Sequence, residues 1–222
     1  MARPRVLLTG FGPFPGVADN PSAWLAETLA ALDADAELHA RVLPTAWQDA
    51  RFMSRFHEEL QPQIMIHFGV SQRAKTFRIE RSAHNRAARQ ADAHGLMPSA
   101  RTIRPDGVDR FDTEVPVAAL AAHLRSCGVP AASSRSAGSY LCNFLYYHSL
   151  DWSRRQADPR LVLFVHIPPL RGRVDPSGQE ALLRGGHEVL RFVLDFSYAK
   201  QKSAPARAAL ARGETILSAK DA

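Results

Sequence analysis

The sequence has little cysteine, and it contains no long hydrophobic run. Its two cysteines, Cys127 and Cys142, fit a reducing compartment and cannot form a metal site alone. No CxxC or HExxH spacing is present, so we expect no metal and no cofactor. No apolar run approaches the roughly 20 residues that cross a bilayer, and the first apolar stretch, Val6–Leu8, is too short for a signal peptide. We therefore predict a cytoplasmic protein without a membrane partner.

Acidic residues are outnumbered by basic ones, but much of the excess is local. The formal net charge is +6, and residues 73–110 alone carry nine Lys or Arg against four acids. A basic segment of this kind raises the question of a nucleic-acid partner. The segment has no stripe of interleaved aromatic residues and no recognised nucleic-acid-binding motif, so we expect no such partner. A non-catalytic binder that uses residues 73–110 for an anionic partner stays open as an alternative.

Short apolar segments alternate along the chain with segments of helical pattern. The segments that we expect to form strands are residues 5–9, 36–43, 64–70, 77–82 and 161–166. The segments that we expect to form helices are residues 20–32, 46–60, 116–127, 142–150 and 179–196. This alternation predicts an α/β protein, a three-layer α/β/α sandwich with a largely parallel central sheet. We expect one domain over residues 1–199 and a C-terminal tail, 200–222, that is a marginal helix or mobile.

Three residues have the settings that nucleophilic catalysis by a thiol requires. Cys142 follows a Ser/Gly turn and precedes a predicted helix, whose positive end favours the thiolate, the nucleophilic form of cysteine. His166 ends an apolar strand, and Glu80 lies in the basic segment. Taken singly, such a histidine is more often part of the core or its edge, and such a glutamate is more often a surface ion-pair partner. Brought together in space, the three could act as nucleophile, base and orienting carboxylate.

Other residues compete for these roles. His67 lies inside the apolar strand 64–70, where core packing is the better interpretation. His84 follows Glu80 in an irregular segment and could line a site instead of acting in it. Cys127 precedes Gly128 at the end of an apolar helical segment, and we interpret it as structural.

The Gly/Pro-rich loop at residues 10–16 follows the first predicted strand, at the sheet edge where α/β proteins bind ligands. The loop does not match a phosphate-binding loop, because it lacks a Gly-Lys-Ser/Thr ending. In addition, Pro13 and Pro15 have no N–H group to offer a phosphate. Phe11 and Phe14, held on a stiff turn, look instead like the walls of an apolar pocket. The alternative is that both rings simply fill the core.

Several stretches taken together resemble pyroglutamyl peptidase I, also called pyrrolidone carboxyl peptidase, a family of cysteine peptidases. Glu80 resembles the catalytic glutamate of that family. The stretches are Thr9–Gly16 with Asn20–Ser22, which resemble TGFxPFxG…NPS, Leu43–Thr45, which resembles LPT, Ser136–Asn143, which resembles SAGxxxCN, and Val165–Pro168, which resembles HxP. Each motif is weak alone, but all of them occur in the family's order. The resemblance covers the chain up to about residue 195 and leaves only the tail outside.

The resemblance implies removal of an N-terminal pyroglutamyl residue from peptides, with no cofactor. It implies Cys142 as the nucleophile, His166 as the general base and Glu80 as the group that orients His166. A thiol amidohydrolase that acts on another lactam or amide stays open as an alternative. The resemblance also leaves a homo-oligomer open.

The same resemblance gives the two phenylalanines a role. Pyroglutamate is a small, flat, uncharged lactam, so its recognition needs apolar walls and one or two hydrogen bonds to the ring. Phe11 and Phe14 are expected to form these walls, with Thr45, Tyr140 and Leu141 nearby. A free N-terminal glutamate would bring charge into an apolar pocket, which is costly.

Overall fold

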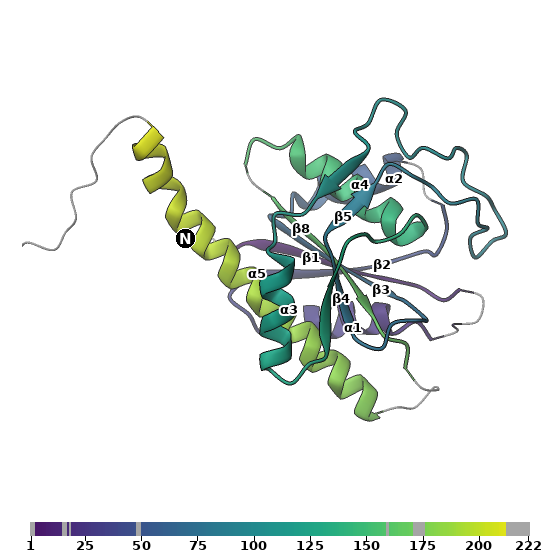
Figure 1. The fold of residues 1–222 in the computed structure, drawn as a ribbon, viewed down its shortest axis with the longest axis horizontal. Helices are drawn as coiled ribbons and strands as arrows, with labels where there is room; N and C mark the ends of the chain where they lie inside the picture. The colour runs from purple at the N-terminus through teal and green to yellow at the C-terminus, as the bar shows by residue number, and fades with distance from the viewer. Residues whose placement is uncertain are drawn as a thin grey trace, which may run out of the picture.

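A six-stranded sheet forms the centre of the protein (Figure 1). The computed structural model describes residues 3–14, 17, 19–47, 50–158, 160–170 and 176–211. In spatial order the strands are β2 (Glu37–Leu43), β1 (Arg5–Phe11), β3 (Ile64–Val70), β8 (Leu161–Ile167), β4 (Phe77–Glu80) and β7 (Ala131–Ser134). A separate two-stranded antiparallel sheet contains β5 (Ser82–His84) and β6 (Arg110–Asp112).

The central sheet is largely parallel, as the alternation of segments predicts. Strands β2, β1, β3 and β8 pair in parallel with their neighbours. Strand β4 pairs antiparallel with β8 and parallel with β7, so the last two strands run against the others. The reversal follows from the short chain between β3 and β4, because a parallel return needs a longer crossover.

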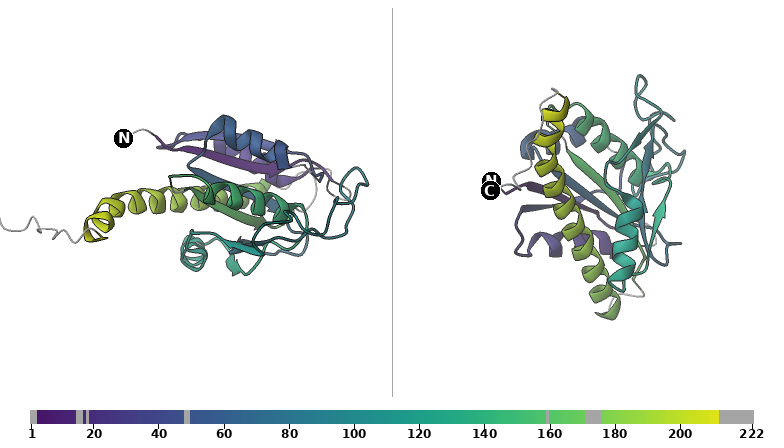
Figure 2. Two further views of the ribbon diagram at one scale, coloured as in Figure 1. Left: turned by 90° about the horizontal axis from the view of Figure 1, so that it is seen from above. Right: turned by 60° about the vertical axis from the view of Figure 1, so that its left-hand side comes forward.

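Helices cover both faces of the sheet and complete the three layers (Figures 1 and 2). The helices are α1 (Pro21–Ala30), α2 (Ala50–Leu60), α3 (Val117–Ser126), α4 (Leu141–Arg154) and α5 (Pro176–Ala211). One apolar core lies between the sheet and α1, α3 and α5, and a second lies between the sheet and α2 and α4. The expected α/β/α sandwich is therefore confirmed.

Local sequence explains where several of these elements begin and end. The Asn20 side chain accepts a hydrogen bond from the Ser22 N–H and so caps α1. Pro21 fits the first helical turn, because an N–H group at that position has no acceptor within the helix and proline has no N–H. Strand β3 is buried along almost its whole length, as its continuous apolar sequence predicts. The last helix is longer than the predicted 179–196 and continues to Ala211. Residues 200–211 of the predicted tail therefore belong to α5, and residues 212–222 lie outside the described residues.

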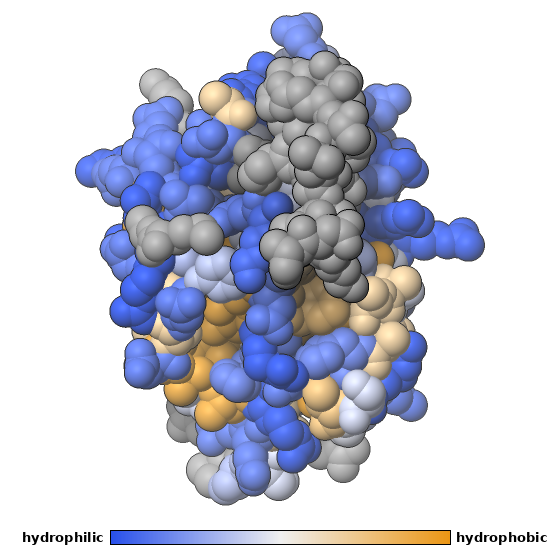
Figure 3. Space-filling view, turned by 90° about the vertical axis from the view of Figure 1, so that its left-hand side faces the viewer, coloured by the Kyte–Doolittle hydropathy of each residue, from blue (hydrophilic) through white to orange (hydrophobic). Residues whose placement is uncertain are grey.

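One face of the molecule is mostly polar. Figure 3 shows the side of the molecule that lies to the left in Figure 1, where hydrophilic residues dominate and apolar residues gather in the lower half. The large apolar side chains that are most exposed among the described residues are Val42, Leu96, Met97 and Val108. Scattered residues of this kind are normal on folded proteins. Among the residues that the structure describes, no helix combines the length and the apolar character needed to cross a membrane.

Three buried histidines lie in the layer between the sheet and helices α2 and α4. His57 shares a 3.2 Å hydrogen bond with Ser149, and His67 shares one of 2.8 Å with Thr9. His148 packs against the ring of Phe144. The His67 and His148 Nε2 atoms are buried without a hydrogen-bond partner among the described residues. Burial lowers the pKa of His57 to about 4, that of His67 to about 3 and that of His148 to about 4. All three side chains are therefore neutral at pH 7.

We predict that the protein loses stability as the pH falls below about 6.5, the pKa of an unfolded histidine. Between that value and about pH 4, the unfolded chain binds protons that the folded chain rejects at His57, His67 and His148. Each such histidine costs about 1.4 kcal/mol of unfolding free energy per pH unit. Urea unfolding at several pH values measures the slope. In a His148→Phe variant the unfolding free energy should depend less steeply on pH, by the contribution of one histidine. An unchanged slope would contradict the prediction.

Candidate active site

Three parallel strands end at one edge of the sheet, and each brings a site residue there. Phe11 ends β1, Val70 ends β3, and His166 is the last but one residue of β8. Gly69 pairs with His166 across the β3–β8 ladder. Ligands bind beyond the carboxyl ends of strands in α/β sheets, so this edge is where a site is expected.

The antiparallel pairing of β4 with β8 brings Glu80 to His166. In the ladder Glu80 lies opposite Phe164, two residues before His166, so the two side chains share one face of the sheet as diagonal neighbours. His166 Nδ1 lies 2.8 Å from Glu80 Oε1. The Glu80 side chain is fully buried, and that of His166 is 12% exposed. A carboxylate in this position fixes which imidazole nitrogen carries the proton and how the ring is oriented.

Cys142 approaches the same histidine from the other side, as the second residue of α4. The turn before the helix contains Gly138, whose φ of 89° lies in the left-handed region that favours glycine. The thiol lies over β3 at Gly69, where a Cβ atom would come within 3.0 Å of Cys142 Sγ and 2.8 Å of the Phe164 ring. Glycine at position 69 therefore makes room for the sulfur beside His166.

The electrostatics of His166 differ from those of the three buried histidines described above. Burial alone would lower its pKa, but the charge of Cys142 and its hydrogen bond with the ring act in the opposite direction, as do the hydrogen bond and charge of Glu80. The net result raises the pKa of His166 to about 9. The histidine is therefore an imidazolium at neutral pH, held between a sulfur and a carboxylate. Such a pair suits a thiolate nucleophile and a proton donor.

A cavity of about 420 Å³ opens beside Cys142. Its lining includes every pocket residue expected from the sequence, namely Phe11, Phe14, Thr45, Tyr140 and Leu141, together with Cys142 itself. The lining also contains residues that the sequence did not predict for the pocket, namely Asn20, Val70, Gln72, Gln90, Ala91 and Asp92. A volume of this size fits a small ligand.

The loop that carries the two phenylalanines is tied down at one carbonyl. The Gly12 carbonyl oxygen accepts hydrogen bonds from Thr45 Oγ1 and from Asn20 Nδ2, both 2.9 Å long. The Gly12 N–H donates to the Leu43 carbonyl at 2.8 Å. Thr45 thus contributes to the pocket by holding the loop as well as by lining the cavity. Phe11 is also part of the core, so its ring both lines the cavity and packs against apolar neighbours.

A second loop, residues 90–96, closes another side of the cavity. The buried Asp92 carboxylate accepts the backbone N–H groups of Trp47, His94 and Leu96, each at 2.9 Å. Tyr140 donates its hydroxyl to the Ala91 carbonyl at 2.8 Å. The bonds to Trp47 and Tyr140 join the loop to distant parts of the chain, and a one-dimensional pattern does not reveal such contacts. An aspartate that bonds backbone N–H groups two and four residues later is a turn-forming signal that could have been noticed.

The two other histidines considered for the base role, His67 and His84, lie outside the lining of the cavity. His67 is fully buried within β3 and bonds Thr9, as core packing predicts. His84 is not among the residues that line the cavity. Its backbone is bound by Asn143, which accepts the His84 N–H at 2.8 Å and donates to the His84 and Arg86 carbonyls. Asn143 follows Cys142 and so fixes the start of α4 against β5, a role that the CN motif alone does not reveal.

Comparison with known proteins identifies the family of the chain. The family model described as pyroglutamyl peptidase matches residues 4–177. The chain belongs to this family. It is therefore related to hydrolases of the cysteine-peptidase class, and its class of enzyme is the one expected from the sequence motifs.

Relatives from distant organisms are similar over most of the chain. The pyrrolidone-carboxylate peptidase of Thermococcus litoralis is 34% identical over 167 residues, which cover 74% of this chain and 76% of that protein. Human pyroglutamyl-peptidase 1 is 32% identical over 204 residues, which cover 88% of this chain and 93% of that protein. The solved structure of the Thermococcus litoralis pyrrolidone carboxyl peptidase superposes with a TM-score of 0.81 at 29% identity, over 89% of this chain and 96% of that one.

Proposed function

We propose that this member of the pyroglutamyl peptidase family removes an N-terminal pyroglutamyl residue from peptides, with Cys142, His166 and Glu80 as its triad. The observation that carries the proposal is the row of Glu80, His166 and Cys142, which ends at a cavity of about 420 Å³ with phenylalanines in its lining. The cytoplasm stays the compartment that we predict, because both cysteines are free thiols.

The reaction would begin from a Cys142 thiolate beside a His166 imidazolium. The sulfur attacks the carbonyl carbon of the pyroglutamyl residue, and the carbonyl oxygen becomes an oxyanion. Backbone N–H groups in the first turn of α4 are suited to stabilise this charge, because the first N–H groups of a helix have no partner within it. His166 then donates its proton to the leaving amine nitrogen, the C–N bond breaks, and a thioester to Cys142 remains.

Deacylation would use the same groups in reverse order. The neutral His166 takes a proton from a water molecule, and the resulting hydroxide equivalent attacks the thioester carbon. The C–S bond breaks and pyroglutamate leaves as its carboxylic acid. Glu80 keeps the His166 ring in the orientation that both steps need, through the 2.8 Å contact at Nδ1. No step requires a group from outside the chain other than water.

The cavity supports a lactam as the substrate group. Phe11 and Phe14 offer apolar surface to a flat ring, and the 90–96 loop lines the cavity with Gln90, Ala91 and Asp92. A site that bonds the lactam N–H and C=O discriminates against rings that lack them, because its own polar groups would then be buried without partners.

A pair of matched amides tests the proposal directly. We expect the protein, in reducing buffer with a chelator, to release a fluorogenic amine from its pyroglutamyl amide at least about 100-fold faster than from the matching prolyl amide. Proline has the same ring size but lacks the lactam carbonyl and carries a charge. No turnover of either amide by folded protein would contradict the proposal. Faster turnover of a six-membered lactam amide would favour the alternative of a different lactam substrate.

A further inference from the structure

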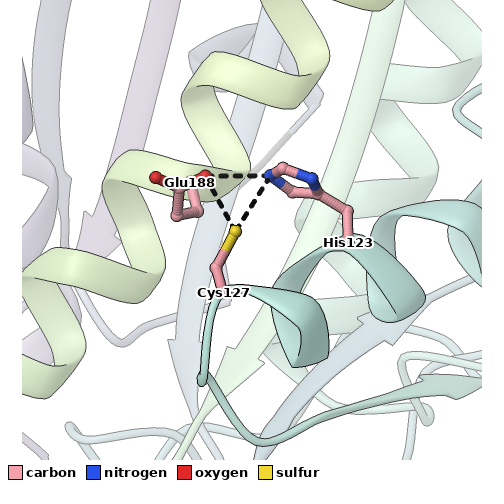
Figure 4. Close-up of side chains that lie close together, drawn as sticks. All are labelled: His123, Cys127 and Glu188. Carbon is pink, nitrogen blue, oxygen red and sulfur yellow. Dashed lines mark hydrogen bonds and ion pairs between the residues drawn. The ribbon is translucent and has the colours of Figure 1, made fainter.

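A second group of reactive side chains lies away from the active site, where α3 meets α5 (Figure 4). It consists of His123, Cys127 and Glu188, and we refer to it as the α3–α5 cluster. His123 and Cys127 are four residues apart at the end of α3, so they lie on one face of the helix. Glu188 faces them from α5. None of the three residues lines the cavity beside Cys142.

The three donor atoms are spaced as ligands of one metal ion would be. His123 Nε2 lies 2.8 Å from Glu188 Oε2, Cys127 Sγ lies 3.5 Å from the same oxygen, and the sulfur lies 3.8 Å from His123 Nε2. Bond lengths to zinc of about 2.0 Å for nitrogen and oxygen and about 2.3 Å for sulfur place tetrahedral ligands roughly 3.3–3.6 Å apart. Shifts of a few tenths of an ångström in the side chains would therefore suffice.

The chemistry of the donors selects the kind of metal. An imidazole, a thiolate and a carboxylate are all zinc ligands, whereas calcium and magnesium prefer sites made of oxygen alone. The cluster is partly exposed, with 24% of the His123 side chain and 16% of the Glu188 side chain open to solvent. We propose that the α3–α5 cluster binds a thiophilic divalent metal, with Zn²⁺ as the expected ion and a water molecule as the fourth ligand.

Arg191 now occupies part of the space that the metal would need. Its Nη2 atom lies 2.6 Å from Glu188 Oε2 and 3.3 Å from His123 Nε2. The arginine side chain is half exposed, so it can turn into solvent when a metal arrives. A metal with two positive charges would replace one guanidinium, and the Cys127 thiol would lose its proton to the solvent as the metal–sulfur bond forms. Arg191 is thus a competitor that weakens metal binding.

Location determines what such a metal would do. The α3–α5 cluster lies on the face of the sheet that is covered by α1, α3 and α5, and Cys142 begins a helix on the other face. A metal there would link the end of α3 to α5 without contacting the catalytic groups. The sequence-based expectation of no metal considered motifs with closely spaced ligands, and Glu188 is 61 residues away from Cys127.

The test uses the full chain with Cys142→Ser, so that Cys127 is the one remaining thiol. Titration with Co²⁺ should produce a thiolate-to-cobalt charge-transfer band that saturates at about one equivalent and is displaced by Zn²⁺. Calorimetry with Zn²⁺ should give the same stoichiometry, and the melting temperature should rise with zinc concentration. Absence of the band at millimolar cobalt would overturn the proposal. In this measurement His123, Cys127 and Glu188 all keep their natural side chains.

Variants of the α3–α5 cluster distinguish metal binding at this site from nonspecific metal binding elsewhere on the protein. In the same background, Cys127→Ser and His123→Gln should each weaken zinc binding by at least about tenfold. Arg191→Met should strengthen it by about fivefold, because a competing cation is removed. His39→Ala is the matched control, since His39 forms a 2.8 Å pair with Glu37 that lacks a thiol, and it should change nothing. Unchanged affinity in Cys127→Ser, or weaker binding in Arg191→Met, would contradict the proposal. Circular dichroism checks that each variant is folded.

Discussion

Replacement of Cys142 with alanine should lower kcat on a pyroglutamyl amide by about 10,000-fold or more, because the thioester cannot form without the sulfur. His166 and the first turn of α4 would remain, but no nucleophile would lie between them. The variant should stay folded, because the thiol is only partly buried and alanine suits the first turn of a helix. Progress curves at high enzyme concentration, with circular dichroism of both proteins, measure the loss.

The second cysteine provides the matched control. Cys127→Ser changes the other free thiol and should leave kcat within about twofold, because Cys127 lies at the end of α3, away from the cavity. Alkylation should show the same contrast, with loss of activity following modification of Cys142. A Cys142→Ala protein that retains a tenth of the wild-type rate would show that Cys142 is not the nucleophile.

Elements with a strong local pattern could be predicted from the sequence. The continuous apolar run 64–70 coincides with β3, and the Asn-Pro-Ser start of α1 forms the expected cap. Both depend on residues that are close together in the chain, where periodicity and capping preferences act. The predicted helix over residues 46–60 has no such capping signal at its start. The described part of helix α2 begins at Ala50, four residues after the predicted first residue.

Features that depend on tertiary contacts could not be predicted. Nothing in the pattern of residues 77–80 shows that β4 runs antiparallel to β8, yet that direction and its register bring Glu80 to His166. The same holds for Asp92, whose carboxylate joins residues that are 45 positions apart. The strands β5, β6 and β7 are three or four residues long, too short to show alternation. The resemblance to the family indicated a catalytic role for Glu80, which the hydrophobic periodicity of the sequence does not indicate.

Glu80→Gln should lower kcat by about 1,000-fold while leaving the fold intact, because glutamine keeps the shape of the side chain but removes its charge. Glu80 is fully buried, and His166 Nδ1 bonds its Oε1 atom at 2.8 Å. Within the described part of the chain, Glu80 Oε2 has no hydrogen-bond partner. The carboxylate therefore interacts with His166 and, at a longer distance, with Arg78. A neutral amide holds an imidazolium less well, and its NH₂ group can select the wrong tautomer.

The pH profile distinguishes this role from a merely structural one. In the wild-type protein the pKa of His166 is raised to about 9, in part by Glu80, so the imidazolium persists through neutral pH. Without the carboxylate this pKa falls, and the alkaline limit of kcat should move to lower pH by about one unit. A structural defect would lower kcat at every pH without moving that limit.

Arg78 provides the matched control for Glu80, because it contacts the same carboxylate oxygen as His166 does. Arg78 Nε lies 3.5 Å from Glu80 Oε1, and 44% of the arginine side chain is exposed to solvent. Arg78 is the more distant partner of the buried carboxylate, and its own charge is screened by solvent, so Arg78→Ala should change kcat by less than about fivefold. If Arg78→Ala instead matched Glu80→Gln, the carboxylate would act through the arginine, and the orientation of His166 would need another source. If Glu80→Gln kept both the rate and the alkaline limit, Glu80 would not be the third member of the triad.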